Sequence, residues 1–178
     1  MRNLINLLTI IRIILAPVIL FFLMTGNYLI CILLFFAAGF TDYLDGHLAR
    51  KYNAESQLGE ILDPIADKIL IVFILLGLSV TLDSYLIAFL SSFIIAREIG
   101  VAALRDYSAR NNISNATKVT YLAKAKTSVQ LLTIFIYLFA LSADIMILII
   151  IADIFLIISV LVTMYTGYEY TINVIDEK

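Results

Sequence analysis

Six long apolar stretches dominate this chain of 178 residues and limit what it can fold into. They centre on residues 10–25, 28–48, 60–82, 84–105, 124–143 and 145–168. Each approaches the ~20 residues that a helix needs to cross a bilayer, once its charged end is included. Charged residues make up only 15% of the chain, whereas about 25% is typical of soluble domains. The sequence therefore predicts an all-α integral membrane protein with six transmembrane helices, built as a single domain over residues 1–178.

The chain begins with MRNLINLLTIIRIILAPVILFFLMTG, in which an early arginine and an apolar run are also typical of a secretory signal peptide. Arg12 interrupts this run, no small-residue cleavage site follows it, and further apolar stretches come later in the chain. We therefore expect a short interfacial segment that leads into the first membrane helix.

Lysine and arginine residues lie at the chain ends and at every second connection between the apolar stretches, which six spans would place on one side of the membrane. They flank the start of the first stretch, the link between the second and third, and the link between the fourth and fifth, and one ends the chain. The three short opposite connections, TGNY, VTLDS and ALSAD, carry none. The positive-inside rule then makes the cationic side and both termini cytoplasmic. The formal net charge of −2 gives no reason to expect a nucleic-acid partner.

Acidic residues gather in FTDYLDGHLARKYNAESQLGEILDPIADK, residues 40–68. Asp42 and Asp45 are three residues apart, and Asp63 and Asp67 are four apart, so each pair occupies one face of a helix. The second and third helices are consecutive and connected at their cytoplasmic ends. We therefore expect the four carboxylates to meet within a few ångströms, in an active site at the cytoplasmic ends of these two helices.

Four anions crowded at low dielectric repel one another unless a cation lies between them. Carboxylate oxygens are ligands of hard cations, so the cluster predicts two Mg²⁺ ions, with Mn²⁺ as the alternative metal. Gly46 and Gly59 would let a phosphate approach the helix backbone beside the acids. The alternative to a metal site is ordinary ion pairing with neighbouring cations, namely Arg50, Lys51 and Lys68.

The segment DYLDGHLARKYNAESQLGEILDPIAD resembles the signature D-x-x-D-G-x-x-A-R-x(8)-G-x-x-x-D-x-x-x-D of the CDP-alcohol phosphatidyltransferase family. It matches at every fixed position, namely Asp42, Asp45, Gly46, Ala49, Arg50, Gly59, Asp63 and Asp67. NLLTIIR near the start is similar to the family's N-terminal element. The resemblance implies a phospholipid-synthesising enzyme of a bacterial-type cytoplasmic membrane. Such an enzyme moves the phosphatidyl group of CDP-diacylglycerol to an alcohol and releases CMP.

The same resemblance implies roles for individual residues. Asp42, Asp45 and Asp63 are expected to bind a first metal ion, and Asp42, Asp63 and Asp67 a second. Asp67 is also expected to be the catalytic base that takes the proton of the alcohol. Contacts to the CDP part of the donor are expected from Gly46, Arg50 and Ser56, with Asn6 and Thr9 as weaker candidates.

A second cationic cluster lies in AREIGVAALRDYSARNNISNATKVTYLAKAKT, at the predicted cytoplasmic ends of the fourth and fifth helices. It contains Arg97, Arg105, Lys124 and Lys126. Converging cations would suit an acceptor alcohol that carries a phosphate, whereas the alternative is ordinary positive-inside flanking. The stretch resembles the REI…ALR and GKxKT elements of family members that use glycerol 3-phosphate, although Ala123 stands where those enzymes usually have glycine. The resemblance therefore implies glycerol 3-phosphate as the acceptor.

Several alternatives stay open at this point. The acceptor could be inositol phosphate or serine. A divalent-cation transporter would also carry membrane carboxylates, but its site should lie near the midplane of a repeat structure, and no repeat is evident. Asp153, within the sixth apolar stretch, is a candidate functional residue, for which we expect a protonated or hydrogen-bonded packing role. The oligomeric state is open, with a homodimer as one option.

Overall fold

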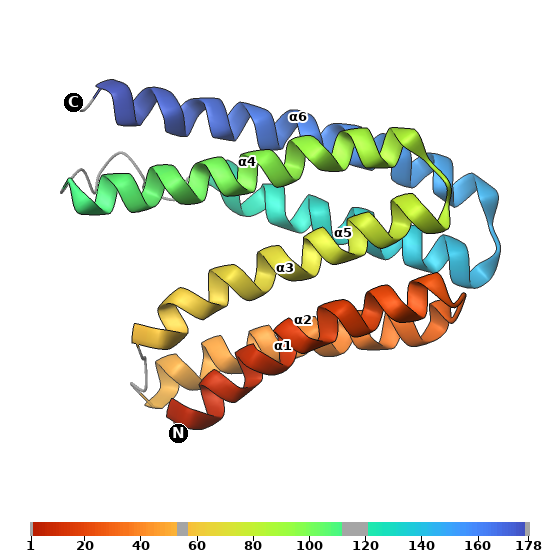
Figure 1. The fold of residues 1–178 in the computed structure, drawn as a ribbon, viewed down its shortest axis with the longest axis horizontal. Coiled ribbons are helices and arrows are strands. Elements are labelled where there is room, and N and C mark those ends of the chain that lie inside the picture. The colour runs from red at the N-terminus through yellow and green to blue at the C-terminus, as the bar shows by residue number, and fades with distance from the viewer. Residues whose placement is uncertain (1, 53–56, 112–120, 177–178) are drawn as a thin grey trace. The chain divides into compact units, whose positions relative to one another are not determined.

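The computed structural model of the chain describes residues 2–52, 57–111 and 121–176. Within these ranges it leaves undescribed the side chains of residues 2–5, 49, 50, 57, 58, 60 and 121–125. The described chain consists of helices joined by short turns (Figure 1). The helices are α1 Arg2–Met24, α2 Tyr28–Tyr52, α3 Gln57–Thr81, α4 Tyr85–Arg110, α5 Tyr121–Ala143 and α6 Met146–Asp176. The prediction of an all-α protein is confirmed.

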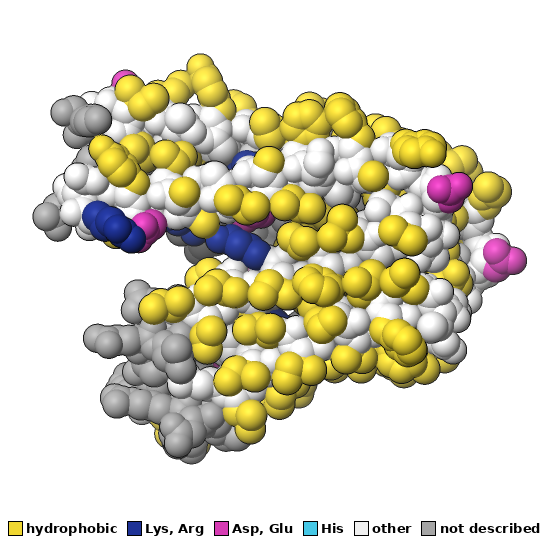
Figure 2. All heavy atoms as spheres, in the orientation of Figure 1, with side chains coloured by type: hydrophobic (Ala, Val, Ile, Leu, Met, Phe, Trp, Pro, Cys, Tyr) yellow, Lys and Arg dark blue, Asp and Glu magenta, His cyan; other side chains and the backbone are white. Residues whose placement is uncertain are grey.

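Among the described residues, five helical segments are long and apolar enough to cross a membrane. They are Asn6–Met24, Tyr28–Leu48, Tyr85–Arg110, Lys126–Ala143 and Met146–Asp176. Hydrophobic side chains cover the visible helix surfaces (Figure 2), and exposed apolar area on this scale marks contact with lipid. The protein is therefore an integral membrane protein.

The third predicted span is not among these five segments. α3 carries Glu60, Asp63, Asp67 and Lys68 in its first half. A sixth span through α3 stays a prediction. So does the separate interfacial segment at the N-terminus, because α1 runs without a break from Arg2 to Met24.

The three short connections form tight turns after helix ends. Gly26, Asp83 and Asp144 have φ angles of 77°, 46° and 56°, the left-handed conformation that commonly ends a helix. Glycine adopts it without steric cost, and aspartate tolerates it better than most residues. The predicted short links between consecutive helices are confirmed.

The chain divides into two compact units. The first comprises Met1–Ser84 with Leu138–Asp144, and the second comprises Tyr85–Tyr137 with Ile145–Lys178. The assignment of residues 1–178 to a single domain stays a prediction.

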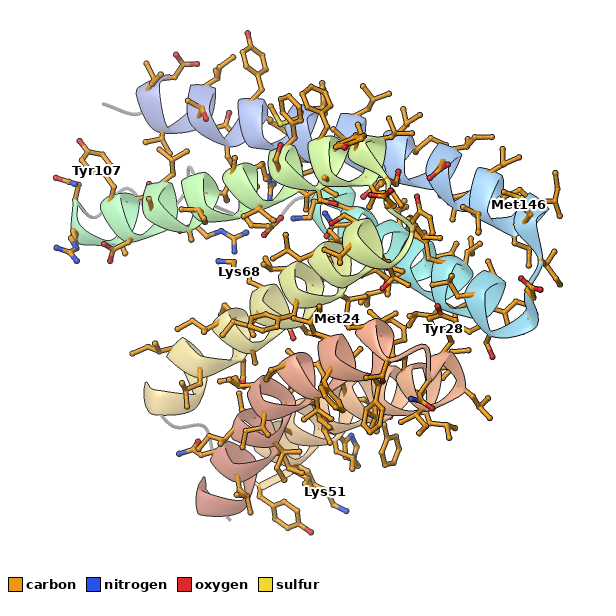
Figure 3. The ribbon with its side chains drawn as sticks, turned by 45° about the vertical axis from the view of Figure 1, so that its right-hand side comes forward. Met24, Tyr28, Lys51, Lys68, Tyr107 and Met146 are labelled. Carbon is orange, nitrogen blue, oxygen red and sulfur yellow. The ribbon has the colours of Figure 1, made fainter. Side chains whose placement is uncertain are left out.

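In the first unit, α1 packs against both α2 and α3. α1 and α3 run in one direction and α2 in the other (Figure 1). The turn flanked by Met24 and Tyr28 lies at one end of this unit (Figure 3). The C-terminal end of α2 and the N-terminal ends of α1 and α3 meet at the other end, which is where the acidic motif lies. The second and third helices are therefore antiparallel (Figure 1).

A close approach between α1 and α3 fixes the position of α1. A Cβ atom at Gly77 would lie 2.8 Å from Leu20 Cδ1 and 2.9 Å from Leu23 Cδ1, so only glycine allows this spacing without displacing the leucines. Ile19 and Ile74 are completely buried in the same core. This packing holds the preceding turns of α1 beside the acidic ends of α2 and α3.

In the second unit, α4 packs against α6, and the two helices run in the same direction (Figure 1). The side chain of Arg97 lies against Gly167, where a Cβ atom would come within 2.9 Å of Arg97 Cγ. α5 joins α6 through a hydrogen bond from Gln130 Nε2 to Thr163 Oγ1, 3.1 Å long. A buried polar layer therefore connects these helices.

Candidate active site

Arg12 of α1 joins three of the four motif aspartates. Its Nη1 atom lies 2.7 Å from Asp42 Oδ1 and 2.7 Å from Asp67 Oδ1, and its Nη2 atom donates to Asp45 Oδ2. One guanidinium thus contacts both acids of α2 and one acid of α3. The structure brings these three carboxylates together, as the spacing of the motif predicts.

Thr9, one turn before Arg12, joins the fourth aspartate to the cluster. Its hydroxyl donates to Asp63 Oδ1 at 2.8 Å and lies 3.5 Å from Asp45 Oδ2. Thr9 is completely buried. A donor at this position holds the carboxylates of α2 and α3 at a fixed separation, because both oxygens approach the same hydroxyl.

The cluster has a buried floor and an open rim. The side chains of Arg12 and Asp45 are 1% and 3% exposed, whereas those of Asp42 and Asp67 are 53% and 50% exposed. The guanidinium of Arg12 balances only one of the four negative charges. Asp42 and Asp67 lie at the open side, where a cation from solvent can approach them.

The donor set fits a hard divalent cation, because all four side chains present carboxylate oxygens. Within the described residues, no three His, Cys, Asp or Glu side chains are arranged as metal ligands. The reason is visible in the contacts, since the carboxylates of Asp42, Asp45 and Asp67 point at the Arg12 guanidinium. A metal ion bound to these oxygens would therefore replace contacts that Arg12 makes.

The neighbouring lysines do not pair with the acids in the described structure. Lys51 is exposed at the C-terminal end of α2 (Figure 3), with its ammonium 5.6 Å from the centre of the Tyr52 ring. Among the described side chains, no ion pair connects Lys51 or Lys68 to the four aspartates. The side chain of Arg50 lies outside the described residues. The acids therefore do form ion pairs, and their partner among the described side chains is Arg12.

The residues predicted to contact CDP are only partly described. Gly46 directly follows Asp45 on α2 and is half-buried, and Asn6 is half-buried one turn before Thr9 on α1. Thr9 itself is bound to the carboxylates. Ser56 and the side chain of Arg50 lie outside the described residues.

Two of the predicted phosphate-binding cations meet in the second unit. Lys126 Nζ binds Glu98 Oε1, and Arg97 Nη1 lies 3.1 Å from the same oxygen. Arg97 is further bound to α6, through Nε to Thr163 O at 3.1 Å and through Nη2 to Thr166 Oγ1 at 2.9 Å. Arg97 of α4 and Lys126 of α5 thus converge on one carboxylate.

Arg105, the third predicted phosphate ligand, lies against Tyr170 of α6. Its Nη2 atom donates to the Tyr170 hydroxyl at 3.2 Å, and its guanidinium carbon is 5.3 Å from the ring centre. The Arg97 guanidinium lies 5.8 Å from the same ring, so one aromatic side chain orients two arginines. The side chain of Lys124 lies outside the described residues.

Sequence reasoning assigned no site role to Arg12, Glu98 or Tyr170. A usable signal existed for the two charged residues, because a charge inside an apolar membrane segment requires a partner. Arg12 interrupts the apolar run, is one of the cations at the start of the first stretch and ends the NLLTIIR element, and Glu98 lies within the quoted REI element. For Tyr170 the sequence contains no feature, other than its aromatic side chain, that indicates a role in the site.

Asp153 has a defined partner in the second unit. The hydroxyl of Tyr137 on α5 donates to Asp153 Oδ1 on α6 at 2.5 Å, and Tyr137 is completely buried. The expectation of a hydrogen-bonded packing role agrees with this contact.

Several known proteins with similar sequences share one name. A protein of Rickettsia typhi is 38% identical over 176 residues, which cover 96% of each chain. A protein of Blochmanniella floridana is 38% identical over 130 residues, 71% of this chain and 68% of that protein. A protein of Escherichia coli K12 is 34% identical over 135 residues, 74% of each chain. All three are named CDP-diacylglycerol--glycerol-3-phosphate 3-phosphatidyltransferase.

The family comparison covers both clusters described above. Residues 2–166 match the family described as CDP-alcohol phosphatidyltransferase, a range that includes all eight signature positions and the cations of α4 and α5. This chain therefore belongs to the CDP-alcohol phosphatidyltransferase family.

Proposed function

We propose that this protein transfers the phosphatidyl group of CDP-diacylglycerol to glycerol 3-phosphate, giving phosphatidylglycerophosphate and CMP. The observation that carries the chemistry is the convergence of Asp42, Asp45 and Asp67 on one point beside α1. The acceptor is supported by the relatives, which are named for glycerol 3-phosphate and match up to 96% of this chain. Family membership favours an enzyme over the divalent-cation transporter.

We further propose that two Mg²⁺ ions, or Mn²⁺ ions, bind the acidic cluster. Asp42, Asp45 and Asp63 would hold one ion, and Asp42, Asp63 and Asp67 the other. The support is the charge balance, because one guanidinium leaves most of the carboxylate charge uncompensated. When bound, such ions would neutralise the diphosphate of the donor and the charge of the departing CMP.

The reaction exchanges one phosphorus–oxygen bond for another. The acceptor hydroxyl oxygen forms a bond to the phosphorus that carries diacylglycerol, and the bond from that phosphorus to the CMP oxygen breaks. The hydroxyl proton passes to Asp67, which we propose as the general base. Its carboxylate is half-exposed at the rim of the cluster, where a substrate hydroxyl can reach it.

Binding of the substrates is assigned to two further groups. Gly46 offers backbone without a side chain next to Asp45, and together with Asn6, Arg50 and Ser56 it would contact the CDP part of the donor. Thr9 supports this region by holding the carboxylates. The phosphate of the acceptor would bind the cations of α4 and α5, namely Arg97, Arg105, Lys124 and Lys126.

The proposed topology extends the membrane assignment. We propose six spans with α3 as the third, both termini in the cytoplasm of a bacterial-type cell, and the acidic cluster at the cytoplasmic side. The positive-inside distribution supports this orientation. Reporter fusions at the TGNY and VTLDS turns would test it, since both turns should be external. Light scattering of the purified protein would decide whether it is a homodimer.

The function is tested with purified protein in detergent, CDP-diacylglycerol, Mg²⁺ and separate acceptors, with CMP release and the lipid product both measured. We expect rapid CMP release with glycerol 3-phosphate and little with glycerol, serine or inositol phosphate. Chelation of divalent cations should abolish the activity, and Mg²⁺ or Mn²⁺ should restore it. A preference for serine or inositol phosphate would overturn the acceptor assignment alone. Absence of CMP release with every acceptor and metal would overturn the proposed reaction.

A further inference from the structure

Glu98 of α4 is the anion on which two predicted acceptor-binding cations converge. Its Oε1 atom accepts from Lys126 Nζ and from Arg97 Nη1, the latter at 3.1 Å. The three side chains are almost closed to solvent, with Lys126 and Arg97 each 6% exposed and Glu98 14% exposed. A carboxylate oxygen bound to two cations in this way makes the same kind of charge-assisted contacts that a phosphate oxygen makes.

The two cations differ in how firmly they are held. Arg97 keeps two contacts to α6 that are independent of Glu98, one to Thr163 and one to Thr166. Its Nη1 atom is therefore fixed in space whether or not Glu98 is present. Lys126 has a flexible four-carbon stem, and among the described residues its ammonium binds Glu98. An incoming anion can bind the ammonium of Lys126 in place of Glu98 while Arg97 keeps its position.

The cluster retains positive charge after Glu98 is counted. Arg97 and Arg105 both lie close enough to Lys126 to repel its charge, and Glu98 is the single carboxylate that binds Arg97 and Lys126 among the described residues. A surplus of cations around one carboxylate attracts a second anion. The most economical arrangement on binding is for phosphate to contact Lys126 and for Glu98 to release it.

We propose that Glu98 is an internal counter-ion that occupies the acceptor-phosphate position and gives up Lys126 when a phosphate-bearing acceptor binds. An alcohol without a phosphate has no charge with which to displace the carboxylate. Glu98 therefore contributes to specificity, by keeping the cations paired until a phosphate arrives. This inference rests on the proposed function, because it takes Lys126 and Arg97 as ligands of the acceptor.

The competing explanation is that Glu98 only holds Lys126 in position for the substrate. The two explanations predict opposite effects for the uncharged variant Glu98→Gln. Loss of a competing anion should tighten the binding of phosphate, whereas loss of an orienting partner should weaken it.

The test measures steady-state kinetics of Glu98→Gln with each substrate varied separately. We expect the KM for glycerol 3-phosphate to fall about tenfold, the effect of removing one competing charge-assisted contact. Inhibition by inorganic phosphate, competitive with the acceptor, should strengthen to a similar degree. The KM for CDP-diacylglycerol should not change. Asp106→Asn is the matched control, because Asp106 lies on the same helix in an exposed ion pair with Arg110.

A second measurement does not depend on catalysis. Glu98→Gln leaves Lys126 without its carboxylate, so the variant should melt at a lower temperature and should be stabilised by inorganic phosphate more than the unmodified protein is. Glu98→Asp, which keeps the charge on a shorter side chain, should give an intermediate KM and supplies a second variant if the glutamine variant does not fold.

The outcomes separate the two proposals. A KM for glycerol 3-phosphate that rises or stays within about twofold in Glu98→Gln would overturn the counter-ion role. If the unmodified enzyme transfers nothing to glycerol 3-phosphate, the proposed function fails. Stabilisation by phosphate would then still show whether Glu98 occupies an anion site.

Discussion

Arg12 and Asp67 lie 55 positions apart in the chain and are joined by a 2.7 Å hydrogen bond. The same guanidinium binds Asp42 and Asp45, so α1 supplies the cation that holds α2 and α3 together at their acidic ends. In the absence of other cations, this contact limits repulsion among the carboxylates. It also makes the stability of the cluster depend on a residue outside the acidic motif.

We predict that Arg12→Gln destabilises the metal-free protein by roughly 3 kcal/mol. Removing one partner of a buried ion pair typically costs 3–5 kcal/mol, and the lower end applies because Asp42 and Asp67 are half-exposed. The loss should be much smaller in saturating Mg²⁺, since bound cations would replace the missing charge. Thermal unfolding in detergent, with chelator and with Mg²⁺, measures both values.

The control for this variant is Arg110→Gln, which removes an arginine from an exposed ion pair on α4. It should change stability by less than about 1 kcal/mol in either condition. Equal destabilisation of Arg12→Gln with and without Mg²⁺ would show that Arg12 has a packing role unrelated to the charge of the cluster.

The four motif aspartates are predicted to be individually necessary for turnover. Asp42→Asn, Asp45→Asn, Asp63→Asn and Asp67→Asn should each lower kcat by at least about 10²-fold, since each removes a metal ligand or the base. The variants should still insert and fold, because asparagine keeps the size of aspartate. CMP release under saturating substrates measures the effect.

Two other aspartates supply matched controls for these substitutions. Asp83 and Asp144 occupy left-handed turn positions, which asparagine also tolerates. Asp83→Asn and Asp144→Asn should leave turnover unchanged. Near-normal activity in any two of the four motif variants would contradict the two-metal proposal.

The hydrogen bond between Tyr137 and Asp153 is predicted to matter for stability and not for chemistry. Tyr137→Phe removes the hydroxyl and leaves the Asp153 carboxyl without this donor, which should cost roughly 1–3 kcal/mol. Both KM values and kcat should stay within about twofold of normal. Tyr165→Phe, at an exposed tyrosine of α6, is the control. A selective loss of kcat in Tyr137→Phe would instead give Asp153 a functional role.

The sequence was sufficient to predict the helices and the meeting of the acids. The apolar stretches are long, and the spacing of Asp42 with Asp45 and of Asp63 with Asp67 places each pair on one helix face. Two consecutive antiparallel helices then bring both pairs to one end. These conclusions depend on local periodicity and on short connections, which a single sequence contains.

The partners of the charges could not be predicted in the same way. Arg12 reaches Asp67 across the packing of α1 against α3, which is close at Gly77, and such long-range packing leaves no periodic signal in the sequence. Glu98 and Lys126 meet across two helices for the same reason. Sequence reasoning therefore predicted which residues carry charge but not which opposite charge each one binds.

The last prediction concerns Arg105, which Tyr170 holds through its ring and its hydroxyl. If Arg105 binds the phosphate of the acceptor, Arg105→Ala should lower kcat/KM for glycerol 3-phosphate by roughly 10- to 150-fold, the loss of one charge-assisted contact of about 1.5–3 kcal/mol. The KM for CDP-diacylglycerol should not change.

Tyr170→Phe keeps the ring and removes only the hydroxyl, so it should reproduce a small part of the effect. Arg110→Ala, at an exposed arginine five residues further along α4, should have none. Parallel changes in both KM values, or a lower membrane yield with normal kinetics, would mean that Arg105 serves topology and not acceptor binding.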